Sequence, residues 1–353
     1  LYSNRDREAV ELSKEQGYKF PEITGWIRAA ADDFKLVCQM GLSETGILTS
    51  ASDYHIFLKL RKTRAQAMNA YLDIVKAALD NGVIPRCHLE DITRADYEGF
   101  VLPFAAELMK LSQEYDKPIK IRLCDTLGFG LPWTGISLPR SIPKLICGLR
   151  QIGVPSERLE WHGHNDLHKV LVNATTAWLF GCSAANAAIL GCGERTGNSP
   201  LEALIVEHAQ LKGMIKGVNY AAITELAEYA KKDLGFDIPH NYPLVGKDFN
   251  VTRAGIHADG LLKNEEIYNC FDTQKLLNRP AGVAITDKTG AAGIKHWIES
   301  KYQIQIPKHD RRITRIKDII DAEYAANRAS IISDEEMFEW VRQSFGDDLP
   351  PLR

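Results

Sequence analysis

Short apolar segments with strand character alternate with longer helical segments over about the first two thirds of this 353-residue chain. Units of this kind, spaced by roughly 30 residues, predict parallel strands joined by helical crossovers. The spacing favours a barrel over an open sheet, in which a glycine-rich nucleotide loop would be expected. We expect strands at 20–27, 34–40, 83–91, 119–125, 184–190 and around His162, and helices at 53–80, 97–115, 139–152 and 200–213.

The predicted fold is therefore α/β, a (β/α)8 TIM barrel that is one strand short of closure. Residues 1–17 have the pattern of a first helix, so the first strand is expected to be missing from this chain. Beyond about residue 236 the alternation stops, and glycines and prolines separate short segments. We expect a catalytic barrel over residues 1–235, and a linker with small helical C-terminal subdomains over residues 236–353.

Composition excludes several classes of function. A net charge of -3 without a long basic run argues against nucleic acid, and no apolar run has membrane-spanning length. The 7 cysteines are scattered and odd in number, which indicates reduced thiols of a cytoplasmic protein. A near-neutral chain of this size suits small-molecule substrates held by local charges.

Two histidines one residue apart, His162 and His164, are the first chemical signal. Side chains two residues apart in a strand point the same way, so both imidazoles can reach one divalent ion. They stand before a helical segment, and the strand-to-helix junction is where a β/α barrel keeps its chemistry. The alternative is an ordinary pair of strand-end histidines.

Three segments, in this order, resemble the isopropylmalate synthase and homocitrate synthase family: residues 162–166, 193–198 and 255–260. Within that family the chain is most similar to the Re-type citrate synthases. The resemblance implies an acyltransferase that condenses acetyl-CoA with oxaloacetate with the help of a divalent metal, Mn or Mg. Such a reaction needs a Lewis acid on the ketone, a base for the methyl proton, and cations for the carboxylates.

The resemblance assigns roles to individual residues, each with a structural alternative. It makes His162, His164 and Asn198 the metal ligands, although Asn198 could equally be a turn residue after Gly197. It implies that the Thr126 hydroxyl binds the carboxylate of the 2-oxo acid. The alternative is that this hydroxyl caps a helix. It places Glu90 at the reaction centre.

A substrate-side histidine, His55, is also implied, and the alternative is a histidine in the first turn of a helix. Two departures from isopropylmalate synthases bear on specificity, because His88 and Arg122 replace serine and asparagine. An apolar 2-oxo acid would leave such groups unpaired, whereas a second carboxylate would satisfy them. The alternative is that Arg122 pairs inside the fold with Glu90 or Asp125.

In the resembling family a histidine and a tyrosine of the extension enter the partner subunit's active site and assist proton transfer. The matching residues are His257 and Tyr268, which implies a homodimer. The alternatives are a surface histidine beside a glycine turn and a packed helical tyrosine.

The family also takes a metal aspartate, an arginine and a glutamate from its first strand, and no such segment occurs here. Asp6-Arg7-Glu8 shares the letters but is expected to begin a helix. Other classes stay open: a homocitrate, citramalate or isopropylmalate synthase, a metal-dependent lyase or carboxyltransferase on the same barrel, and a binding protein without activity.

Overall fold

The computed structural model describes residues 3–253, 257, 260–261, 263–307 and 309–350. The chain divides into two compact units, residues 1–213 and 214–353. Within the described part of the chain, no helix has both the length and the apolar character needed to cross a membrane.

The first unit is built around a sheet of six parallel strands in sequence order. Sequential order among parallel strands requires a crossover after each strand, and helices supply these crossovers. The strands are β1 (Gly25–Arg28), β2 (Glu44–Ser50), β3 (Ile84–Glu90), β4 (Lys120–Asp125), β5 (Leu159–Gly163) and β6 (Ala184–Ala185).

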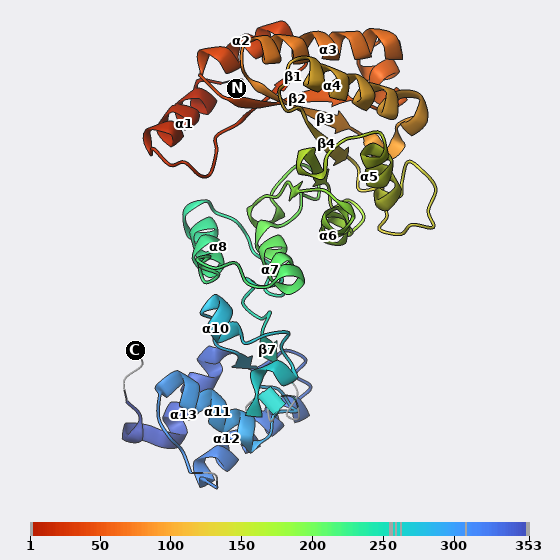
Figure 1. Ribbon diagram of the computed structural model, residues 1–353. Coiled ribbons are helices and arrows are strands. Elements are labelled where there is room, and N and C mark those ends of the chain that lie inside the picture. Colours follow the sequence, from red (N-terminus) through yellow and green to blue (C-terminus); the bar gives the residue numbers. More distant parts are fainter. Residues whose placement is uncertain (1–2, 254–256, 258–259, 262, 308, 351–353) are drawn as a thin grey trace. The chain divides into compact units, whose positions relative to one another are not determined.

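Helix α1 precedes this sheet, and α2, α3 and α4 lie next to one another along one face of it (Figure 1). The helices are α1 (Asn4–Glu15), α2 (Ala31–Gln39), α3 (Arg64–Asp80), α4 (Leu102–Glu114), α5 (Ile142–Gln151), α6 (Val170–Phe180) and α7 (Leu201–Lys212). Short helical turns lie between them: η1 (Tyr54–Lys59), η2 (Ile92–Arg94), η3 (Tyr97–Val101), η4 (Ser156–Arg158) and η5 (Ile189–Gly191).

The two faces of the sheet differ in chemistry, because strand residues alternate between them. The face that carries Ile47, Leu89, Leu123 and Trp161 is fully buried in the main apolar core. The opposite face is polar. Its register aligns Leu48 with His88, Arg122 and Glu160, and one step further along the strands it aligns Ser50 with Glu90, Cys124 and His162.

One predicted strand is a helix. Residues 34–39 lie in α2 (Ala31–Gln39) and Met40 caps its C-terminus; the buried Phe34 and Val37 are three residues apart on one helical face. Asp32 and Asp33 in its first turn favour the helix, since acidic side chains stabilise helix N-termini. The strand expected at 184–190 is also shorter than predicted, and only Ala184–Ala185 pairs with β5.

The second unit is mainly helical around its own apolar core, which includes Ile294, Trp297, Ile316 and Met337. Residues 251–252 and 282–283 form a small parallel pair. Its elements are α8 (Ala222–Asp233), β7 (Val251–Thr252), η6 (Glu265–Ile267), α10 (Thr273–Leu277), β8 (Gly282–Val283), α11 (Ala291–Tyr302), α12 (Arg311–Ala325), α13 (Asp334–Phe345) and η7 (Gly346–Asp348).

Candidate functional site

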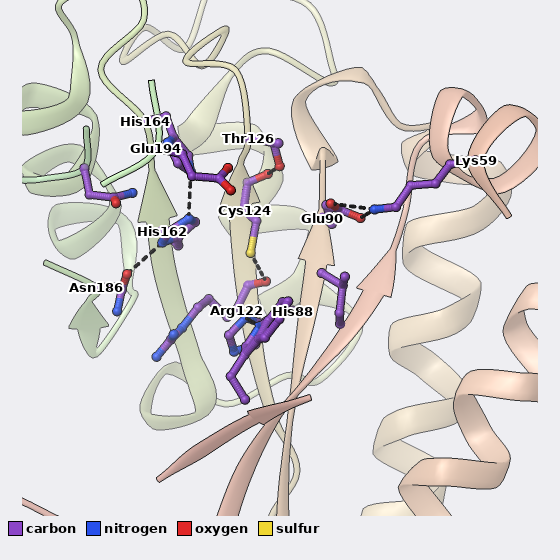
Figure 2. A pocket seen from close by; sticks show the side chains of 13 residues that line it. Lys59, His88, Glu90, Arg122, Cys124, Thr126, His162, His164, Asn186 and Glu194 are labelled. Atoms are coloured by element: carbon purple, nitrogen blue, oxygen red, sulfur yellow. Dashed lines mark hydrogen bonds and ion pairs between the residues drawn. The ribbon is translucent and has the colours of Figure 1, made fainter. Parts of the chain in front are cut away.

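A pocket of about 530 Å³ opens at the polar face of the sheet, near the carboxyl ends of the strands (Figure 2). Most of the residues singled out from the sequence line it together: His88, Glu90, Arg122, Thr126, His162, His164 and Asn198. Trp26, Lys59, Asn186 and Glu194 also line it. His55 lies behind Glu90, while His257 and Tyr268 belong to the second unit.

The two histidines of β5 and its following loop converge on one point. The Nε2 atoms of His162 and His164 are 3.2 Å apart. Figure 2 shows the two side chains pointing toward one another. Two nitrogen ligands about 2.1 Å from an octahedral ion, at right angles to each other, are separated by about 3.0 Å. The pair therefore has the spacing that two ligands of one ion need.

The protonation states of the two imidazole rings also favour binding of one metal ion. His162 Nδ1 lies 2.7 Å from Asn186 Oδ1, an acceptor that holds the proton on Nδ1 and leaves the Nε2 lone pair free. Burial lowers the pKa of His162 to about 4, and burial with the nearby charge of Arg195 lowers that of His164. Both imidazoles are neutral at pH 7, as metal ligands must be.

Asn198 is brought to the same place by an isolated bridge between its backbone and that of His164. Its Nδ2 donates to the Gly163 carbonyl at 3.0 Å, so Oδ1 is the atom that can serve as a ligand. Gly197 precedes it with φ +90, where a Cβ would overlap the Gly191 carbonyl. Among the described residues no group of three or more His, Cys, Asp and Glu is placed to hold a metal.

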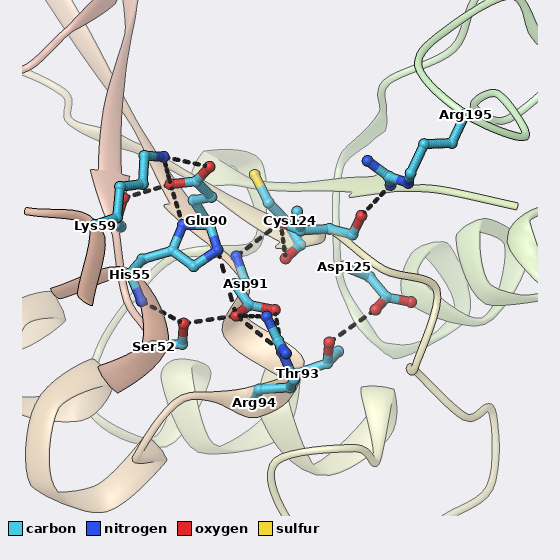
Figure 3. Close-up of polar contacts among 12 residues, drawn as sticks. Ser52, His55, Lys59, Glu90, Asp91, Thr93, Arg94, Cys124, Asp125 and Arg195 are labelled. Atoms are coloured by element: carbon cyan, nitrogen blue, oxygen red, sulfur yellow. Dashed lines mark hydrogen bonds and ion pairs between the residues drawn. The ribbon is translucent and has the colours of Figure 1, made fainter. Parts of the chain in front are cut away.

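Glu90 stands at the centre of a polar cluster at the end of β3 (Figure 3). Lys59 Nζ lies 3.0 Å and His55 Nδ1 lies 2.8 Å from Glu90 Oε2, and the Ser50 hydroxyl donates to the same oxygen. Burial alone would raise the pKa of Glu90, but the hydrogen bonds from His55 and Ser50 outweigh it and lower the pKa to about 2. Glu90 is therefore an ionised acceptor and a weak base.

Thr126 lies in the turn after β4, and its hydroxyl accepts from the Asp91 amide at 2.8 Å. The helix-cap alternative is not observed, because the next helix begins at Ile142. His55 does lie in the first turn of η1, and it also contacts Glu90 and Asp91.

Asp166 lies in the loop after β5, where its Oδ1 accepts a hydrogen bond from Arg195 Nε at 2.8 Å; the N-cap of α6 is Lys169. The same guanidinium also donates to the Thr126 carbonyl, so Arg195 ties together the loops after β4, β5 and β6.

Beneath the pocket, side chains of alternating charge form a series that we call the charge ladder: Lys120, Glu44, Arg86, Glu160 and Arg122. Arg122 Nη2 lies 2.7 Å from Glu160 Oε2, and Arg86 Nε lies 3.0 Å from the same oxygen. The expected internal partners of Arg122, Glu90 and Asp125, are engaged elsewhere; Asp125 accepts from Thr93 at 2.8 Å.

His88 lies beside Arg122 in the sheet register and is buried. Trp26 Nε1 donates to His88 Nδ1 at 3.2 Å, which places the single proton of the neutral ring on Nε2. Burial, then the charges of Arg122, His162 and Arg86, lower the pKa of His88 well below its usual value. His88 is therefore a neutral hydrogen-bond donor.

In the second unit, the rings of His257 and Tyr268 contact each other in a tilted arrangement, with centroids 4.3 Å apart and an interplanar angle of 38°. Tyr268 follows η6 and is 45% exposed, so it is not the packed helical residue of the alternative interpretation. Residues 254–256 and 258–259, which complete the sequence motif around His257, lie outside the described residues.

Four candidate functional residues were not predicted from the sequence: Trp26, Lys59, Glu160 and Asn186. Glu160 could have been found, since it stands two residues before His162 and must share its face. Asn186 follows β6 as the other candidates follow their strands. Nothing in the local sequence marks Trp26 or Lys59.

The HMGL-like family model matches residues 1–229. The chain is 56% identical over 348 residues to a Citrate (Re)-synthase of Syntrophus aciditrophicus, covering 97% of this chain and 55% of the relative. It is 55% identical over 342 residues to a Citrate (Re)-synthase of Clostridium kluyveri, covering 96% of this chain and 76% of the relative. A 2-phosphinomethylmalate synthase of Streptomyces hygroscopicus is 39% identical, over 98% of this chain and 80% of the relative. The chain thus spans little more than half of the Syntrophus protein.

Solved structures share the fold. A hydroxymethylglutaryl-CoA lyase of Pseudomonas aeruginosa has a TM-score of 0.50 at 21% identity, covering 62% of this chain and 73% of that one. The Bacillus subtilis HMG-CoA lyase has a TM-score of 0.53 at 18% identity, covering 66% and 77%. Together with the family model, these likenesses confirm the predicted fold class, a TIM-type β/α barrel with a helical C-terminal extension.

Proposed function

The chain belongs to the HMGL-like family, and from this premise we propose that it acts as an acyltransferase that condenses acetyl-CoA with oxaloacetate to give citrate and CoA. The observation that carries the proposal is the convergence of His162 and His164, 3.2 Å apart, in a pocket whose inner end holds Arg122 and His88. The names of the two relatives above 50% identity supply the reaction.

We propose that His162, His164 and the amide oxygen of Asn198 hold one divalent cation, Mg or Mn. The spacing and neutrality of the two imidazoles fit such an ion, and a mixed nitrogen and oxygen donor set suits it. When bound, the ion would supply a Lewis acid for the ketone of the 2-oxo acid.

The remaining pocket residues supply what a dicarboxylic acceptor needs. Oxaloacetate has a carboxylate at each end, and Thr126 lies at the pocket rim formed by the β4 loop while Arg122 lies deeper on the same strand. His88 and Arg122 are aligned in the sheet register, so a neutral ring and a cation stand at the same level of adjacent strands. Ionised Glu90 holds Lys59 and His55 around the pocket.

We also propose that His257 and Tyr268, whose rings contact each other in the second unit, assist proton transfer. Histidine is the side chain that most often serves as a general base, here for a proton of the acetyl methyl group. We propose that these two residues reach the site of the partner subunit in a homodimer. A cytoplasmic location is proposed as well, since the 7 cysteines are all free thiols.

The substitution Arg122→Asn tests the choice of substrate. Glu160 keeps Arg86 as its partner in this variant, so the fold should tolerate the change. Losing one charge-assisted pair should reduce kcat/KM for oxaloacetate by about a hundredfold, while pyruvate turnover changes little. Melting temperature and the oxaloacetate-to-pyruvate ratio should be measured together; an unchanged ratio would defeat the dicarboxylate assignment.

A further inference from the structure

The charge ladder is not balanced. Its three cations (Lys120, Arg86 and Arg122) and two carboxylates (Glu44 and Glu160) leave a net charge of +1. Glu160 serves both arginines, and only Arg122 lines the pocket. The side chains of Arg86, Arg122 and Glu160 are 11%, 14% and 8% exposed, so solvent screens this imbalance weakly.

We propose that Arg86 is a specificity-determining positioning residue: by sharing Glu160, it leaves positive charge on Arg122 for the second carboxylate of a dicarboxylic 2-oxo acid. The inference rests on the proposed function for the identity of that acid. Arg86 itself is not among the residues that line the pocket.

The neighbouring charges do not cancel the surplus at Arg122. His88 is neutral, and Glu90 is engaged by Lys59. Glu22 acts on Lys120, at the far end of the ladder, and on Arg86, its middle member, but Glu22 is exposed, so solvent screens its charge. Without Arg86, Glu160 would belong to Arg122 alone, and the guanidinium would be neutralised inside the fold.

Three variants change the net charge of the ladder without replacing a residue that lines the pocket. Arg86→Met removes one cation and gives the ladder a net charge of zero. Arg86→Met with Glu160→Gln removes one charge of each sign and returns the ladder to +1. Glu160→Gln alone raises it to +2. Lys35→Met, which removes an exposed lysine of α2, is the matched control for loss of a cation elsewhere.

Calorimetry measures binding of L-malate and L-lactate to the Mg-loaded full-length protein. Malate has a second carboxylate and lactate does not, so the ratio of the two affinities reports on that carboxylate without any turnover. The change of one unit charge in a weakly screened site should weaken malate binding roughly tenfold or more in Arg86→Met. Lactate binding should stay the same. The double variant should recover the malate preference, and Glu160→Gln should bind malate more tightly than the unmodified protein. Oxaloacetate and pyruvate kcat/KM values should follow the same order.

A malate-to-lactate ratio that is equal in Arg86→Met and the unmodified protein would overturn the inference. A double variant that binds malate as weakly as Arg86→Met would also overturn the inference, because Arg86 would then act through shape and not through charge. If Arg86→Met does not fold, failure of Glu160→Gln to tighten malate binding overturns it equally. Absence of citrate formation with an intact malate preference would instead refute the proposed function and leave the role of Arg86 standing.

Discussion

The acid side of the stability profile depends on Glu90. Its carboxylate is 16% exposed and is contacted by Lys59, His55 and the Ser50 hydroxyl. Its pKa is about 2 in the folded protein, against an ordinary value of 4.5. Because the folded pKa is the lower one, the stabilisation is present above pH 4.5 and is lost as the pH falls towards 2.

The difference of about 2.5 pKa units corresponds to about 3 kcal/mol of unfolding free energy at pH 7. Linkage with these two values removes about 1 kcal/mol of it by pH 4 and about 2 kcal/mol by pH 3. We therefore expect Glu90→Gln to be less stable than the unmodified protein at pH 7, with a difference that narrows by about 2 kcal/mol at pH 3.

Chemical unfolding at pH 7, 5, 4 and 3, followed by circular dichroism, measures this difference. Asp32→Asn is the control, since Asp32 forms an exposed pair with Lys35 that is worth less than about 1 kcal/mol. A difference between the unmodified protein and Glu90→Gln that stays constant from pH 7 to 3 would show that Glu90 is not held ionised by its neighbours.

Three further predictions concern the metal site and the crossing of the extension between subunits. The double variant His162→Ala and His164→Ala should lose binding of Mn in calorimetry, and stoichiometric binding would refute the ligand assignment. Mixing an inactive His162→Ala chain with an inactive His257→Ala chain should restore some activity if the extension crosses between subunits. No recovery in a verified heterodimer would argue against crossing. Gly193→Ala should weaken Mn binding as much as Asn198→Ala does, because a Cβ at Gly193 would overlap Asn198 Oδ1, and full affinity in both variants would remove Asn198 from the ligand set.

The sequence predicted the parts of the site that depend on local periodicity. His162 and His164 share a face because strand side chains repeat every two residues, and the pocket residues gather because parallel strands end at one edge. The family resemblance was confirmed by the HMGL-like model and by the synthases among the relatives.

Contacts between strands could not be predicted in the same way. The partner of Arg122 is Glu160 because β4 and β5 pair in that register, and a single sequence does not specify the register of parallel strands. The Trp26–His88 hydrogen bond likewise joins β1 and β3, which are not adjacent. The helix at 31–39 was mistaken for a strand because a short apolar run fits both periodicities.

We propose above that the pocket accepts a dicarboxylic 2-oxo acid for condensation with acetyl-CoA. The most direct measurement is release of CoA by the full-length protein with Mn or Mg and a panel of oxaloacetate, pyruvate, 2-oxobutyrate, 2-oxoisovalerate and 2-oxoglutarate, with the products identified by mass spectrometry. We expect the highest kcat/KM with oxaloacetate and citrate as its product. A higher kcat/KM with pyruvate or 2-oxoisovalerate, or no CoA release with oxaloacetate, would contradict the account.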